Sequence, residues 1–388
     1  MAALTTALAP RAIKDSTIYS SRVSHAESDL LNLARARMFR TRLILSILLF
    51  VIGCAPSIQL AASPDLGARL QVKLVDDEAM SALAILEQEF AARPVDERQW
   101  QRLFSAEGYL RLKQRENYMK RTFTDADFRG FIQSDTLIRR TPALRLAVAG
   151  FEKVDASTAA RQALSYLPSG ARIVARLYPE IKPHTNSFVF SQDSIPGIFV
   201  YVDPARTPAE FQNTLTHELH HIGLNSVCRS EPDTSLREPL RTLVYRMGGF
   251  GEGFAMLAAA GSPDSNAHYE SDSASRDQWD RDVANHEANL RLLETFFLNV
   301  VECRVTSPYS VNALAGQFYG AQGPWYTVGW KMAVTIEKVF GRSSLLAVMC
   351  DPPALLRRYN EAVAVWNRSH AEKLPVWTDR LLALLKTT

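Results

Sequence analysis

The chain has 388 residues, of which 47% are apolar and 22% are charged, a composition typical of a globular protein with one large or two moderate domains. Its formal net charge is +3, but residues 1–53 hold seven basic and three acidic side chains, so the remainder is close to neutral. This balance gives no sign of the basic surface that nucleic-acid binding requires, and we expect no nucleic-acid partner.

Residues 38–54 read MFRTRLILSILLFVIGC. A short basic segment precedes an uncharged run at residues 43–52, and Gly53 and Cys54 end that run. About ten such residues are too few to span a bilayer, but they suit the core of a signal peptide. The order of parts resembles a bacterial lipoprotein signal. That resemblance implies lipidation of Cys54, membrane attachment through the lipidated N-terminus, and a place in the bacterial cell envelope, at the periplasmic face or outer membrane. An uncleaved anchor or a buried helix is the alternative.

The N-terminal region therefore divides into three parts. We expect residues 1–37 to be an extension upstream of a true start at Met38, residues 38–53 to be the signal peptide, and residues 54–74 to be a tether. Besides Cys54, the chain has Cys228, Cys303 and Cys350, with no C-x-x-C spacing. In an exported protein two of these three can form a disulfide, which leaves one over.

Residues 75–388 are predicted to form one mainly helical (α+β) domain with a small β-sheet. Apolar residues recur every three or four positions from 76 to 167, which indicates helices. Two β-branched, aromatic stretches at 171–178 and 198–202 predict strands, separated by the turn-rich segment 181–196. Residues 261–276 read as a polar loop. The remaining helices are expected at 208–223, 236–247, 251–260, 276–304, 324–340, 343–349, 352–366 and 373–386.

The second strand leads into a helix that carries THELHHIG at residues 216–223. Thr207, Pro208 and Glu210 form a good helix start, with a capping box and proline at the first position. On this helix one face is apolar, whereas His217 and His221 fall one turn apart on another. The pattern is H-E-x-x-H, whose two imidazoles suit a zinc ion and whose Glu218 can act as general base. His220 does not lie on the helix face that carries His217 and His221, so it is not expected to be a ligand. Gly223 can end the helix.

A catalytic zinc site needs a third protein ligand. No histidine follows at the metzincin spacing, so a carboxylate is the candidate, and Glu231, Asp233, Glu238 and Glu252 lie downstream. Glu252 has the best setting, because glycines on both sides allow its helix to approach another closely.

The Glu-Gly-Phe-Ala segment at 252–255 resembles the element that carries the third zinc ligand in gluzincin peptidases. The order IFVYVDP, HELHHIG, GEGFA and WYTVGWKMA, over roughly residues 75–385, is similar to uncharacterised bacterial families of zinc-dependent peptidases. The resemblance implies one Zn²⁺ per chain, held by His217, His221 and Glu252, with Glu218 as general base. It also implies a tyrosine donor for the developing oxyanion, for which Tyr326 is the candidate.

Two histidines are alternative candidates for the oxyanion donor, and two motifs of known gluzincin branches are absent from this chain. His268 and His286 are weaker candidates for the oxyanion donor, and we expect both at the surface. The chain lacks the G-x-M-E-N loop of the aminopeptidase branch, and Met256 stands where the thermolysin-like branch has aspartate. No substrate preference, and no choice between endo- and exopeptidase, is therefore carried over.

The predicted function is a zinc-dependent peptidase acting on a peptide or protein substrate. One alternative is a non-catalytic envelope lipoprotein with a structural or relic zinc site, in which Cys228 is the nearest residue that could add a fourth ligand. The other is a zinc amidase that acts on a non-protein amide, since it would use the same chemistry. The sequence gives no indication of oligomeric state.

Overall fold

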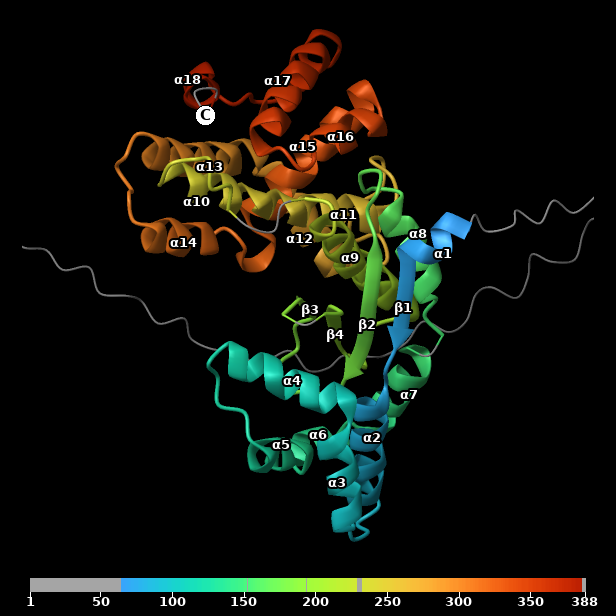
Figure 1. The fold of residues 1–388 in the computed structure, drawn as a ribbon. Coiled ribbons are helices and arrows are strands. Elements are labelled where there is room, and N and C mark those ends of the chain that lie inside the picture. The colour runs from blue at the N-terminus through green and yellow to red at the C-terminus, as the bar shows by residue number, and fades with distance from the viewer. Residues whose placement is uncertain (1–63, 152, 193, 229–231, 386–388) are drawn as a thin grey trace, which may run out of the picture. The chain divides into compact units, whose positions relative to one another are not determined.

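The computed structural model describes residues 64–385 apart from 152, 193 and 229–231. This part of the chain is mostly helical with one small sheet, which confirms the predicted fold class (Figure 1). The sheet has the order β1-β2-β4-β3, in which β1, β2 and β4 are parallel and β3 is antiparallel to β4. The strands are β1 (Leu70–Leu74), β2 (Ile173–Glu180), β3 (Phe188–Phe190) and β4 (Gly197–Tyr201).

Six of the eight helices before β2, those between Asp77 and Phe151, build one hydrophobic core. Tyr109 and Phe128 pack there with Tyr178 and Phe199, which come from the sheet. These N-terminal helices therefore pack onto the sheet, because the strands supply part of their core. The eight helices before β2 are α1 (Pro64–Arg69), α2 (Asp77–Phe90), α3 (Glu97–Ser105), α4 (Glu107–Tyr118), α5 (Asp125–Ile132), α6 (Asp135–Arg139), α7 (Thr141–Phe151) and α8 (Ala156–Leu164).

The helices after the sheet build the larger core, together with α8 and the other side chains of β2 and β4. They are α9 (Pro208–Asn225), α10 (Leu240–Arg246), α11 (Gly251–Ala260), α12 (Ser273–Ala284), α13 (His286–Val301), α14 (Pro308–Gly316), α15 (Pro324–Phe340), α16 (Arg342–Val348), α17 (Pro352–Ser369) and α18 (Asp379–Leu384). Two short 3₁₀ helices, η1 (Met247–Phe250) and η2 (Gly320–Gln322), precede α11 and α15.

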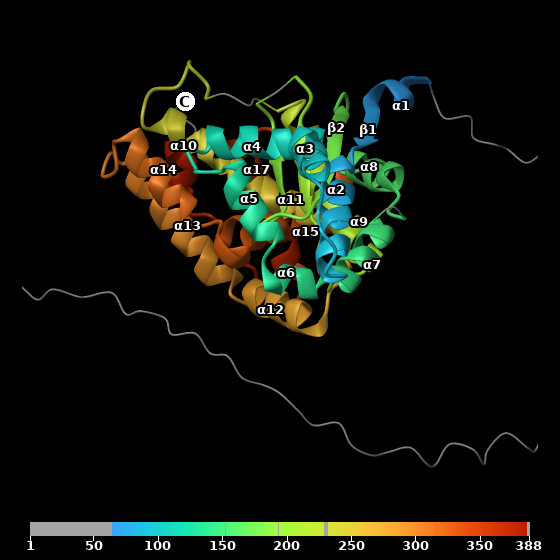
Figure 2. The same cartoon turned by 90° about the horizontal axis from the view of Figure 1, so that it is seen from below.

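The sheet lies between α2 to α6 and most of the later helices, whereas α8 packs directly against α9 (Figure 1). In Figure 1, α2 to α6 gather below the strands, whereas α9 and the later helices lie beside and above them. Figure 2, seen from below, places α13 and α14 on one side of the molecule and α7 and α8 on the other. Helix α9 lies inside this arrangement and contacts α8, α11 and β2.

Three expectations for individual elements are wrong. Leu70–Leu74 was expected in the tether but forms β1, because it pairs in parallel with Ile173–Leu177 of β2. The segment 276–304 was expected as one helix but forms α12 and α13, which break at Asn285. The break lets Trp279 pack with Met256 while Leu290 and Phe297 join the larger core. Helix α18 begins only at Asp379, where Thr378 caps it.

Three further elements were not expected. Helix α1 lies in the segment that was expected as a tether. Helix α14 lies where no helix was predicted, and β3 lies in the segment that reads as turns. Both are short, and β3 becomes a strand because its backbone pairs with β4, a partner that local sequence does not reveal.

Cys228 and Cys350 form a disulfide, and Cys303 is free and exposed. The sequence allowed such a pair without indicating which two cysteines would form it. The extension, the signal peptide and Cys54 lie outside the described residues. Among the described residues, none of the helices is both long and apolar enough to cross a membrane.

Candidate metal centre

Helix α9 begins as the sequence predicts. Thr207 accepts a hydrogen bond from the Glu210 backbone N–H at 3.2 Å, and the Glu210 carboxylate accepts one from the Thr207 N–H at 2.7 Å. The expected end at Gly223 is wrong, because the helix runs on to Asn225. A Cβ on Gly223 would lie 2.1 Å from Leu167 Cδ1. This glycine therefore serves close packing against the chain that leads into β2, and it does not end the helix.

The faces of α9 divide as the 3.6-residue period requires. Phe211, Leu215 and Leu219 are buried in the larger core. The side chains of His217 and His221 stay 14% and 20% exposed, so a ligand can reach both from outside. His220 is fully buried, and its Nε2 donates to the Tyr166 carbonyl oxygen at 3.2 Å. His220 thus anchors α9 to the end of α8 and does not take part in the imidazole pair.

Glu252 reaches the imidazoles because two glycines let α11 approach its neighbours. A Cβ on Gly251 would lie 3.3 Å from Leu224 of α9. A Cβ on Gly253 would lie 2.0 Å from the backbone N of Trp330, and one on Gly329 would lie 2.6 Å from the Phe250 carbonyl oxygen. Helices α11 and α15 therefore cross where Gly253 faces Gly329, and their backbones come close at this point. This close crossing places Glu252, in the first turn of α11, beside α9.

Three ligand atoms converge at this crossing. His217 Nε2 and His221 Nε2 are 3.0 Å apart, and Glu252 Oε2 lies 3.3 Å from the first and 3.2 Å from the second. Ligands at about 2.0–2.2 Å from one tetrahedral ion stand roughly 3.4 Å from each other. Two imidazole nitrogens and one carboxylate oxygen form a typical donor set for zinc, so these residues fit the metal that the motif predicts.

The charges at the centre support one another. Burial alone would raise the pKa of Glu252, but the His221 and His217 imidazoles hold it well below the usual range. Burial favours neutral His221, yet the Glu252 carboxylate raises the pKa of His221 to about 9. For Glu218, burial dominates and raises its pKa, although His217 and His221 oppose this. The two carboxyl groups thus have different environments, and Glu218 is the one that more readily takes up a proton.

Tyr326 of α15 also lies at this centre. Its ring is nearly parallel to that of His217, at 12°, with 6.4 Å between the ring centres. Burial, followed by the nearby Glu252 carboxylate, raises the pKa of Tyr326, so its hydroxyl keeps its proton. The structure therefore brings the predicted hydroxyl donor next to the predicted ligands, from a helix more than 100 residues after the two histidines.

The weaker donor candidates have other partners. The Gln322 amide donates to His268 Nε2 at 2.7 Å, and His268 Nδ1 pairs with Ser271 Oγ at 3.2 Å. Both ring nitrogens of His268 are thus used within the protein. His286 was expected at the surface, which is wrong: it is 5% exposed and hydrogen-bonds to the Tyr359 hydroxyl at 3.0 Å.

The other carboxylates considered as third ligand lie elsewhere. Glu238 accepts hydrogen bonds from Arg241 and Thr242 at the start of α10. Asp233 accepts from the backbone and side chain of Ser235, and Glu231 lies outside the described residues. Sequence reasoning also missed Tyr319, whose pKa is raised to about 12 by burial and then by Glu252. Its only sequence signal is its place near the start of α15.

Comparison with known proteins gives one match. A family model described as "Putative zinc dependent peptidase (DUF5700)" matches residues 100–367. This range includes both histidines, Glu218, Glu252 and Tyr326. No curated protein and no solved structure matches the chain.

Proposed function

Because the chain belongs to this DUF5700 family of zinc-dependent peptidases, we propose that it is a gluzincin-type hydrolase that cleaves peptide bonds. His217, His221 and Glu252 would hold one zinc ion per chain. The observation that carries the proposal is the convergence of these three donor atoms within 3.3 Å of one another, with Glu218 on the same helix between two of them.

The chain's own residues account for the proton transfers of hydrolysis. Zinc, when bound, supplies a Lewis acid that lowers the pKa of water and polarises a carbonyl group. Glu218 would accept the proton of the attacking water and then deliver it to the leaving amine. The raised pKa of Glu218, which follows from its burial, suits both tasks. Tyr326 would donate its hydroxyl hydrogen to the oxyanion that forms from the carbonyl oxygen.

A purely structural zinc site is less well supported. Such a site has four protein ligands, and Cys228 was the residue nearest in sequence that could supply the fourth. The disulfide with Cys350 removes the thiolate that a metal would need. A zinc amidase acting on a non-protein amide remains the second candidate, because the same residues would perform that reaction.

We also propose that the protein is exported and anchored to the cell envelope through Cys54. Support comes from the signal-like order of residues 38–54 and from the Cys228–Cys350 disulfide, since disulfides persist in oxidising compartments. Mass spectrometry of the mature N-terminus would identify a lipid on Cys54, and Cys54→Ser should release the chain into the soluble fraction. An unmodified N-terminus upstream of residue 54 would overturn this.

The first test combines metal content with activity. Elemental mass spectrometry of the purified protein should find one zinc per chain, and peptide mixtures should be cleaved. Glu218→Gln should keep the zinc but lose cleavage by at least about a hundredfold, because the general base is absent. Folded protein without zinc, or a Glu218→Gln variant with full activity, would contradict the proposal.

A further inference from the structure

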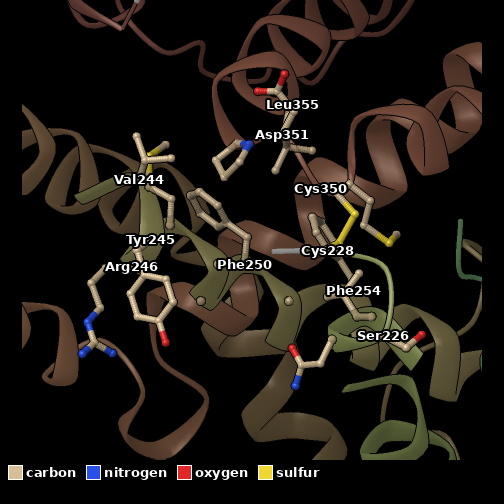
Figure 3. Close-up of a pocket in the computed structure, with 18 of the residues that line it drawn as sticks. Ser226, Cys228, Val244, Tyr245, Arg246, Phe250, Phe254, Cys350, Asp351 and Leu355 are labelled. Carbon is tan, nitrogen blue, oxygen red and sulfur yellow. A yellow bond between two sulfur atoms is a disulfide. The ribbon is translucent and has the colours of Figure 1, made fainter. Parts of the chain in front are cut away.

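A cavity of about 1020 Å³ lies at the C-terminal end of α9, beside the Cys228–Cys350 disulfide and Phe254 (Figure 3). Neither Glu218 nor any of the three metal ligands lines it. A peptide bond held at the metal centre would therefore not be in contact with this cavity. Recognition of a substrate next to the scissile bond depends instead on the face of α9 that carries the ligands.

That face continues from the two histidines toward the start of the helix. Thr214, His217 and His221 are partly exposed, whereas Leu215 and Leu219 between them are buried. At about 100° per residue, Thr214 points within roughly 20° of the direction of His221 and roughly 60° of that of His217. Thr214 therefore lies on the metal side of α9, one turn before the first ligand.

Arg206 is held against this face. It directly precedes the N-cap Thr207, in a turn where its backbone N–H donates to the Asp203 carbonyl oxygen at 3.1 Å. Its Nη1 donates to Thr214 Oγ1 at 3.2 Å. At a rise of about 1.5 Å per residue from Thr214 to the level of the two histidines, the guanidinium stands on the order of 10 Å from the metal ligands.

The Arg206 guanidinium has N–H groups left for a ligand. Among the described residues, Thr214 is its one hydrogen-bond partner. Asp203 Oδ2 lies 3.9 Å from the Arg206 Nε, beyond hydrogen-bonding distance, and the Arg206 side chain is 37% exposed. Arginine carries five N–H donors in a planar fork that matches the two oxygens of a carboxylate. Arg206 is thus a cation on the metal side of α9 that can bind a carboxylate.

We propose that Arg206 binds a carboxylate of the peptide substrate, one or two residues from the scissile bond. A peptide extends by about 3.3–3.6 Å per residue, so one or two residues together with a hydrogen bond bridge the distance from the metal centre. The carboxylate is either the C-terminus of the substrate or an aspartate or glutamate side chain, which share this chemistry. The proposal rests on the proposed peptidase function for the position of the scissile bond, but not for the binding of the carboxylate.

The test measures binding without cleavage. The full chain carrying Glu218→Gln is loaded with zinc and titrated by calorimetry with three acetylated pentapeptides. Two consist of alanine and end in a free carboxylate or in an amide, and the third is an amide whose last residue is aspartate. At least one anionic peptide should bind about tenfold or more tightly than the neutral amide, because charge-assisted hydrogen bonds form. The tighter anionic peptide identifies the source of the carboxylate, and equal affinities of all three would overturn the proposal.

Zinc also binds carboxylates, and Arg206→Gln separates the two cases. This variant should lose at least about fivefold of the preference for the anionic peptide, because its side chain is neutral. Its zinc content and its affinity for the neutral amide should stay the same. Arg206→Lys keeps the charge without the planar fork and should lose less. A preference that Arg206→Gln retains in full would place the carboxylate on the metal and overturn the proposal.

Arg161→Gln is the matched control. Arg161 also donates to a threonine hydroxyl, that of Thr158, and lies 3.8 Å from Asp155, but it belongs to α8, which packs on the buried face of α9. Arg161→Gln should keep the preference, and a loss equal to that of Arg206→Gln would overturn the proposal.

The outcomes also separate this inference from the proposed function. If the wild-type chain cleaves no peptide while Arg206→Gln loses the preference, the proposed function fails and the carboxylate site stands. Peptide cleavage by a chain that shows no preference for the anionic peptides would overturn this inference alone.

Discussion

The described part of the chain brings two carboxyl groups together in two places with opposite surroundings. At the metal centre, Glu218 and Glu252 lie among two imidazoles. Where α2 meets the end of β2, Glu78 and Glu180 are fully buried, and Lys182 is the cation beside them. The first pair belongs to the proposed active site, whereas the second lies between the N-terminal helices and the sheet.

The electrostatic outcome differs accordingly. Burial is the first influence at all four carboxyls, but the imidazoles hold the pKa of Glu252 well below its usual range. Burial raises the pKa of Glu78 to about 8 and that of Glu180 well above its usual range, and the Glu78 carboxylate adds to the effect at Glu180. Both carboxyl oxygens of Glu180 lack a hydrogen-bond partner among the described residues. The metal centre is therefore arranged to hold a cation, whereas the second pair retains a proton.

The largest expected effect comes from removing the carboxylate at the metal centre. Glu252→Ala should lose the zinc and lower peptide cleavage by more than about a hundredfold, since one of three ligands is gone. Elemental mass spectrometry and peptide cleavage would measure this. Glu238→Ala is the matched control, because Glu238 was a rival third ligand and pairs instead with Arg241. Zinc retained in Glu252→Ala but lost in Glu238→Ala would reverse the assignment.

The second effect concerns the glycine that positions Glu252. Gly253→Ala places a methyl group 2.0 Å from the Trp330 backbone nitrogen, so α11 and α15 must separate. We expect a loss of about 2–3 kcal/mol in the free energy of unfolding and weaker zinc binding. Urea unfolding and metal titration would show both. Gly248→Ala is the control, because its added methyl group meets no atom within 4 Å and should change the free energy of unfolding by less than about 1 kcal/mol. Equal losses in Gly248→Ala and Gly253→Ala would contradict the close approach of α11 and α15.

The third effect tests the second carboxyl pair. Since the folded-state pKa of Glu180 is above its unfolded value of 4.5, wild-type stability should fall as pH rises from about 5 toward 8. Glu180→Gln cannot ionise and should show a decline smaller by about 1–3 kcal/mol over that range. Urea unfolding at both pH values measures it, with the exposed Glu97→Gln as control. Identical pH profiles of wild type and Glu180→Gln would rule out the retained proton.

The smallest effect concerns His286, a buried imidazole with no carboxylate among the groups that shift its pKa. Burial lowers the pKa of His286 to about 3, whereas Glu252 raises that of His221. Neutral His286 therefore stabilises the fold above pH 6.5, and this contribution is lost as pH falls toward 3. Between pH 7 and 5, wild type should lose about 1–2 kcal/mol more than His286→Gln. Thermal unfolding would detect this, with the exposed His370→Gln expected to behave as wild type.

Elements with strong local signals were predicted well. Helix α11 at Gly251–Ala260 and α15 at Pro324–Phe340 have the expected bounds, since glycines and an initial proline mark their ends. The expected start of α9 is also correct, because its capping box forms within four residues. Strand β1 was missed because its partner β2 begins about 100 residues later, and β3 was missed because its three residues lie in a turn-rich segment.

The two imidazoles one turn apart, with Glu218 beside them, could be predicted from residues 217–221, because the period of one helix sets those positions. The tertiary structure alone decided that Glu252 Oε2 comes within 3.3 Å of His217 and that Tyr326 lies alongside. It also decided that Glu78 lies near Glu180 and that a cavity opens at the C-terminal end of α9. Distances between helices depend on how their surfaces pack, as Gly253 and Gly329 show, and that packing involves residues far apart in the chain.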